Sequence, residues 1–124
     1  MTELTIETRC CIAGGGPAGM MLGFLLARAG VDVVVLEKHA DFFRDFRGDT
    51  VHPSTLENMY ELGLLDEFLK VPHQKLERLS MQVGDEKLSI IDLTHLPSHC
   101  KVIALMPQWD FLNFLAAHCK SYKT

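Results

Sequence analysis

The sequence predicts an α/β fold that begins with a strand–helix–strand unit. Three observations in its first 38 residues support this prediction. An apolar segment over Thr5–Ala13 precedes a run of glycines, a segment with helical spacing covers Ala18–Ala29, and the nearly all-apolar Val31–Leu36 follows. Two strands joined by a helix within about 30 residues form a right-handed crossover with parallel strands. We therefore expect a parallel pair of strands at the N-terminal end.

The expected helix of this unit has a start signal and a stop signal. Pro17 suits a first helical position, where its missing N–H costs no hydrogen bond, and Gly30 suits the helix end. The second strand is rich in β-branched residues, so we expect it to be buried on both faces. The stripe that the helix is expected to bury consists of Met21, Leu22, Leu25, Leu26 and Ala29.

A second helix is predicted in the middle of the chain. Ser54 is a candidate N-cap, and Glu57 three residues later would complete a capping box. Gly63 is placed to end this helix. A further short helical turn is expected over Leu64–Lys70.

The remaining segments predict a hairpin, a strand and a last helix. Two short apolar-rich runs within Arg78–Leu93 are joined by the sequence GDE, which is typical of a β-hairpin. Lys101–Leu105 is a candidate strand. A helix is expected to begin at Pro107, with Trp109, Leu112, Leu115, Ala116 and Cys119 at helical spacing.

Composition narrows the function classes. The chain has 124 residues, 48% of them hydrophobic, which suits one small folded domain and not a disordered chain. Its formal net charge of -4 argues against binding to a nucleic-acid backbone. The longest apolar run, Met20–Ala27, is too short to cross a bilayer, and the acidic N-terminus does not resemble a secretory signal. We therefore expect a cytoplasmic protein without a membrane segment.

Cysteines and histidines do not form a recognisable metal motif. The four cysteines lack C-x-x-C spacing and are expected to be buried, reduced thiols. His95 and His99 are four residues apart, but Pro97 between them forbids a regular helix, so no metal site is expected.

The segment GGGPAG, residues 14–19, carries the first functional signal. It lies between the first expected strand and the first expected helix. Gly14 permits a sharp turn, Gly16 has no Cβ and lets a pyrophosphate approach the main chain, and Gly19 lets helix and strand pack closely. The helix N-terminus at Pro17 and Ala18 would present N–H groups to the phosphates. This context predicts a dinucleotide-binding site.

Glu37 supplies the second part of this fingerprint. It ends the second strand 18 residues after Gly19, where a carboxylate accepts hydrogen bonds from a ribose diol. A 2′-phosphate would be repelled there. The expected ligand is FAD or NAD, with NADP disfavoured, and Lys38 is a further candidate contact at the adenine edge.

Three longer segments resemble a known family. They are similar to the N-terminal part of the para-hydroxybenzoate-hydroxylase-like FAD-dependent monooxygenases, which include aromatic-ring and ubiquinone-pathway hydroxylases. The three segments are IAGGGPAGMMLGFLLARAGVDVVVLEK, RGDTVHPSTLENMYELGLLDEF and MPQWDFLNFLAAHC. The resemblance spans nearly the whole chain. It implies a partial Rossmann-like FAD-binding domain over residues 1–124, with residues of about 75–100 beginning a substrate-covering sheet.

The resemblance also implies cofactors and site residues. FAD would lie with its pyrophosphate at the glycines and its ribose at Glu37, Arg47 would lie near the flavin, and Gln108 would contact the ribityl–pyrophosphate region. The family chemistry is reduction of FAD by NADH or NADPH, followed by hydroxylation of an aromatic or related small molecule through a flavin hydroperoxide. The pattern identifies no catalytic residue in this chain.

Two later motifs of that family, an Asp-Gly and a Gly-Asp-Ala-like segment, are not present in these 124 residues. We therefore interpret the sequence as an N-terminal fragment of a longer enzyme, incomplete for catalysis by itself. Two alternatives are an NAD-dependent dehydrogenase domain and a non-catalytic Rossmann-like piece that binds nucleotide weakly or only packs against a partner chain. A half-sheet with exposed apolar strands is also expected to self-associate.

Overall fold

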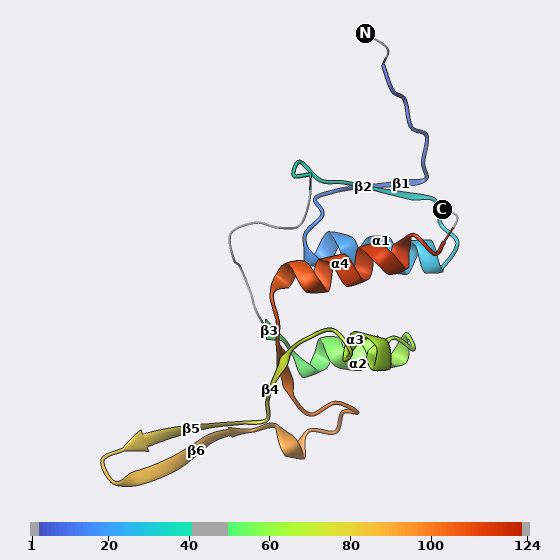
Figure 1. Ribbon diagram of the computed structural model, residues 1–124. Coiled ribbons are helices and arrows are strands. Elements are labelled where there is room, and N and C mark those ends of the chain that lie inside the picture. Colours follow the sequence, from blue (N-terminus) through green and yellow to red (C-terminus); the bar gives the residue numbers. More distant parts are fainter. Residues whose placement is uncertain (1–2, 41–49, 123–124) are drawn as a thin grey trace. The chain divides into compact units, whose positions relative to one another are not determined.

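The computed structural model describes residues 3–40 and 50–122 (Figure 1). The chain divides into two compact units, one from residues 1–45 and 109–124 and the other from residues 46–108. Among the described helices, none is long and apolar enough to cross a membrane.

The first unit contains the predicted parallel crossover. Strand β1 (Cys10–Ala13) pairs with β2 (Val33–Leu36) in parallel, residue for residue, and α1 (Pro17–Arg28) connects them. Helix α4 (Gln108–Cys119) lies beside α1 on the same face of the pair (Figure 1). The βαβ prediction is confirmed, although β1 begins at Cys10 and not at Thr5, because its partner β2 provides only four residues for pairing.

Helix α1 buries a different face from the one we expected. Its buried residues are Met20, Gly23, Phe24 and Ala27, whereas Leu22 and Leu25 are 47% and 41% exposed. The helix packs on the strands through its small residues, since a Cβ on Gly23 would lie only 2.8 Å from Cγ2 of Val35. Close contact at the glycines therefore decides which face turns inward, and the leucines turn outward.

The expectation that β2 is buried on both faces is wrong. None of its residues is fully buried, and Leu36 is 53% exposed. The helices described in this unit cover one face of the strand pair, which leaves the other face accessible (Figure 1). The expectation of buried cysteines is likewise wrong, because Cys11 is exposed and the other three are only partly buried; all four are free thiols.

The second unit is a three-stranded antiparallel sheet with two helices. The strands β3 (Thr50–Val51), β7 (Ile103–Leu105) and β4 (Gln74–Leu76) pair in the order β3–β7–β4. Helices α2 (Pro53–Glu61) and α3 (Leu65–Phe68) pack on one another. The core of this unit consists of Val51, Leu56, Met59, Leu65, Phe68, Val102, Ala104 and Met106.

The hairpin prediction is confirmed. Strands β5 (Arg78–Val83) and β6 (Glu86–Asp92) pair antiparallel around a turn in which Gly84 has a φ of +61°, and a 3-10 helix over Leu93–His95 follows. Cross-strand pairs such as Met81 with Leu88 share one face, and both side chains are about half exposed. The hairpin therefore presents an apolar face that nothing described in this unit covers.

The predicted capping box at Ser54 is wrong. Helix α2 begins at Pro53 with His52 as its N-cap, and no side chain caps it. Glu57 instead accepts hydrogen bonds from His99, which is 42 residues away in the sequence. Glu57 therefore pairs with the distant residue His99 and does not form the expected local capping box with Ser54.

Candidate functional site at the glycine loop

The loop between β1 and α1 takes a conformation that requires glycine. Gly14 has a φ of +119°, in the region that side chains disfavour. Its N–H donates to the carbonyl of Leu36 at 2.8 Å and continues the strand pairing by one residue. The chain therefore turns sharply at the carboxyl end of β1.

Gly16 leaves open space at the start of α1. It is the N-cap residue of the helix, no side chain caps the N-terminal N–H groups, and Pro17 occupies the first turn. A Cβ on Gly16 would meet no atom within 4 Å. The first N–H groups of the helix, including those of Ala18 and Gly19, are thus accessible to a ligand that accepts hydrogen bonds.

Gly19 brings the helix against the loop. A Cβ on this residue would overlap the carbonyl oxygen of Gly14 and would lie 3.1 Å from its carbonyl carbon. Only glycine allows this separation, which fixes the helix N-terminus directly behind the turn. The roles predicted for the three motif glycines as turn, open approach and close packing agree with this geometry.

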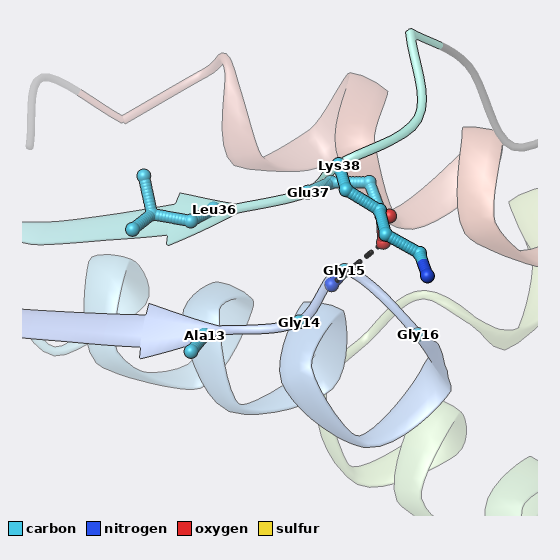
Figure 2. A pocket seen from close by; sticks show the side chains of 7 residues that line it. All are labelled: Ala13, Gly14, Gly15, Gly16, Leu36, Glu37 and Lys38. Carbon is cyan, nitrogen blue, oxygen red and sulfur yellow. Dashed lines mark hydrogen bonds between the residues drawn. The ribbon is translucent and has the colours of Figure 1, made fainter.

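The carboxylate of Glu37 points onto the glycine loop. Its Oε2 accepts a hydrogen bond from the N–H of Gly15 at 2.9 Å (Figure 2). Its Oε1 accepts one from the main-chain N–H of His39 at 3.1 Å. Gly15 is buried, and a Cβ there would lie 2.9 Å from Oε2 of Glu37. The sequence pattern did not single out Gly15, because the middle position of the motif can hold any residue.

The loop and the end of β2 enclose an open cleft of about 580 Å³. Figure 2 shows the side chains of Glu37 and Lys38 leaving the same end of β2 toward the loop. The cleft thus combines main-chain donors, one carboxylate and one ammonium group. It is lined by Ala13, Gly14, Gly15, Gly16, Leu36, Glu37 and Lys38.

Seven of the nine predicted site residues lie at this cleft or at the start of α1 beside it. They are Gly14, Gly16, Pro17, Ala18, Gly19, Glu37 and Lys38. Gln108 is the half-buried first residue of α4. Arg47 lies outside the described residues. No group of three or more metal-ligating side chains occurs among residues 3–40 and 50–122.

Comparison with known proteins identifies the family. A family model described as FAD binding domain matches residues 7–123. The chain belongs to the FAD binding domain family. FAD is therefore the cofactor of this domain, and the alternative of an NAD-dependent dehydrogenase is not favoured.

The relatives include several monooxygenases. An uncharacterized aromatic compound monooxygenase of Bacillus subtilis (strain 168) is 32% identical over 98% of this chain and 23% of its own length. The p-hydroxybenzoate hydroxylase of Acinetobacter baylyi is 32% identical over 61% of this chain and 20% of its own length. The solved p-nitrophenol 4-monooxygenase of Pseudomonas putida DLL-E4 matches with a TM-score of 0.79 and 26% identity, over 95% of this chain and 30% of that one.

The family resemblance noted in the sequence is thus confirmed. The chain spans less than a third of the length of these relatives.

Proposed function

We propose that this chain is the FAD-binding N-terminal portion of a flavin-dependent monooxygenase that hydroxylates an aromatic or related small molecule. The observation that carries the proposal is the carboxylate of Glu37 held on the N–H of Gly15, beside an uncapped helix N-terminus. Together these groups match the two polar parts of an adenosine diphosphate moiety, its ribose and its pyrophosphate.

The pyrophosphate is proposed to lie at Gly14, Gly16, Pro17, Ala18 and Gly19. The support is the open space at Gly16, where a Cβ would touch nothing, together with the N–H groups that begin α1. The partial positive charge of the helix N-terminus favours the phosphate oxygens.

Glu37 is proposed to bind the ribose diol. A carboxylate has about four acceptor positions on its two oxygens, so hydrogen bonds from two main-chain N–H groups are compatible with accepting a ribose hydroxyl as well. The same negative charge disfavours a 2′-phosphate. Lys38 lines the same cleft and is proposed to contact the adenine edge. Contacts from Arg47 to the flavin and from Gln108 to the ribityl–pyrophosphate region remain predictions.

The activity of the whole protein is proposed from its relatives. Names of two of them specify aromatic substrates, p-hydroxybenzoate and p-nitrophenol. We propose that the bound flavin supplies the redox chemistry with NADH or NADPH as reductant, while this chain holds and orients the cofactor. The segment of about residues 75–100, which contains the hairpin, is proposed to begin the sheet that covers the substrate. A cytoplasmic location also remains a prediction.

A direct test measures FAD binding by the 124-residue chain, with quenching of the flavin fluorescence as the readout. Glu37→Gln should weaken binding by at least about tenfold, because a charged hydrogen-bond acceptor is lost. Glu7→Gln, the same change at an exposed position of the same unit, is the control and should leave binding unchanged.

A folded chain that binds NAD more tightly than FAD would contradict the proposal and favour a dehydrogenase. A folded chain that binds neither nucleotide would favour the non-catalytic alternative.

A further inference from the structure

A second cluster of polar side chains lies in the other unit, remote in sequence from the glycine loop. Glu57 of α2 accepts two hydrogen bonds from a single residue, His99. Its Oε2 accepts the main-chain N–H at 2.9 Å, and its Oε1 lies 2.8 Å from the ring Nδ1. Glu57 thus joins α2 to a segment that follows the hairpin in the sequence.

The ring of His99 is also held from a second direction. It stacks on the ring of Tyr60, with 3.6 Å between the ring centroids and an angle of 13° between the planes. Tyr60 lies three residues after Glu57, so both contacts come from one face of α2. Two hydrogen bonds and a stacked ring fix the position and the rotation of this imidazole.

The position of His99 in the chain gives these contacts a structural consequence. It belongs to the segment between the 3-10 helix that follows the hairpin and strand β7, which begins at Ile103. β7 is the central strand of the β3–β7–β4 sheet and leads to Gln108. A contact that fixes His99 therefore fixes the place where the chain returns from the hairpin to the sheet.

We propose that Glu57 is a latch that holds the segment Leu93–Lys101 on helix α2 and releases it when the Glu57 carboxylate takes up a proton. Glu57 and His99 lie outside the glycine loop and take no part in the proposed cofactor binding. Glu57 acts as a positioning residue for Leu93–Lys101, the return segment.

The chemistry of the pair determines how the latch responds to pH. An ionised carboxylate can only accept, so Nδ1 of His99 carries the proton in the neutral ring, and Nε2 is left unprotonated. Protonation of His99 adds a proton at Nε2 and leaves the Nδ1–H donor in place. Only protonation of Glu57 removes the acceptor.

The pKa of Glu57 agrees with this reasoning. Hydrogen bonds from the main chain and then the ring of His99 hold the pKa of Glu57 below its ordinary value. A carboxyl with a lowered folded pKa stabilises the latch at neutral pH, and the contribution is lost as the pH falls through that lowered value. The latch is thus closed at neutral pH and opens only on acidification, as the Glu57 carboxylate takes up its proton.

No other described side chain takes the place of His99 as a partner that lowers the pKa of Glu57. The remaining titratable groups on the elements that meet here are Glu61 on α2, Asp66 and Glu67 on α3, and His95, Cys100 and Lys101 on the return segment.

The test uses NMR on the full 124-residue chain. A long-range ¹H–¹⁵N spectrum of the imidazoles at neutral pH should show the Nδ1–H tautomer for His99, and hydrogen exchange should show a protected His99 amide. Glu57→Gln should lower the protection of this amide by about threefold to tenfold and shift the tautomer balance toward Nε2–H. Glu61→Gln removes the same charge from the same exposed side of α2 and should change neither signal.

An Nε2–H tautomer in the native chain would overturn the proposal. Unchanged protection of His99 in a folded Glu57→Gln chain would also overturn it. If the variant fails to fold, the native chain still decides: in a titration toward acid pH, the His99 amide should lose its protection before the Leu64 amide, which donates to the carbonyl of Met59 at the C-terminal end of α2. Simultaneous loss of the two would show that no separate latch exists.

Discussion

Replacing Gly19 with alanine should destabilise the first unit, because helix α1 meets the glycine loop at this residue. The added Cβ would overlap the carbonyl oxygen of Gly14 and approach Cγ2 of Ile12 to 3.4 Å. The overlapped atom belongs to the main chain and cannot rotate away, so we take the upper end of the overpacking cost, about 3 kcal/mol. Alanine in a helix recovers about 1 kcal/mol. The expected net loss is about 2 kcal/mol.

Urea unfolding, followed by the fluorescence of the single tryptophan, Trp109, measures this loss. With a slope of about 1.5 kcal/mol per molar urea, the midpoint should fall by about 1.3 M. Two other glycines provide graded controls. Gly23→Ala meets side-chain methyl groups, of Val35 at 2.8 Å and of Ile12 at 3.8 Å, and should cost less. Gly16→Ala meets no atom within 4 Å and should change the free energy of unfolding by less than about 1 kcal/mol.

Gly16→Ala should nevertheless reduce FAD affinity, because its methyl group fills the space proposed for the pyrophosphate. Gly19→Ala should therefore lower stability, whereas Gly16→Ala should lower FAD affinity with little change in stability. A Gly19→Ala chain with an unchanged midpoint would refute the reasoning, since it would mean that the loop gives way to a Cβ without measurable cost.

Three further predictions concern other parts of the chain. Glu37→Arg should lower FAD affinity while improving the binding of NADP relative to NAD, because a cation replaces the carboxylate that repels a 2′-phosphate; equal retention of FAD by mutant and native chains in equilibrium dialysis would contradict this. Leu56→Ala should lower the free energy of unfolding by about 2–5 kcal/mol, measured in urea, because Leu56 is fully buried in the core of the second unit; a loss below about 1 kcal/mol would contradict that packing. Exposed apolar strands favour self-association, so Met81→Lys on the apolar face of the hairpin should reduce light scattering by associated chains and leave the free energy of unfolding nearly unchanged; an unaltered scattering profile would contradict this.

The sequence was sufficient where local chemistry determines the structure. Pro17 and Gly30 bound α1 as expected, and Gly14 and Gly16 of the glycine motif line one cleft with Glu37. Each of these features depends on the conformational limits of glycine and proline or on the short connections of a crossover. Such constraints act within a few residues and are visible in the pattern.

The sequence was insufficient where distant residues compete. Glu57 has the spacing of a capping box, but His99 offers it two donors and Pro53 begins the helix one residue before the expected N-cap. Strands β3 and β4 were not predicted, because they have only two and three residues and acquire their structure from pairing with β7. Their existence depends on a partner that follows much later in the chain.

The leucines of α1 illustrate the same limit. A hydrophobic stripe indicated that Leu22 and Leu25 face inward, yet both are exposed. Helical periodicity measures apolar bulk and cannot register the close approach that glycine permits at positions 19 and 23.

The central claim is that main-chain N–H groups of residues 15–19 and the carboxylate of Glu37 bind the adenosine diphosphate part of FAD. A ¹H–¹⁵N titration of the labelled chain with FAD tests it most directly. We predict that the largest amide shifts occur at Gly15, Gly16, Ala18 and Gly19, while the hairpin amide of Gly84 stays unchanged. Saturable FAD binding that leaves the amides of the glycine loop unshifted would contradict the claim.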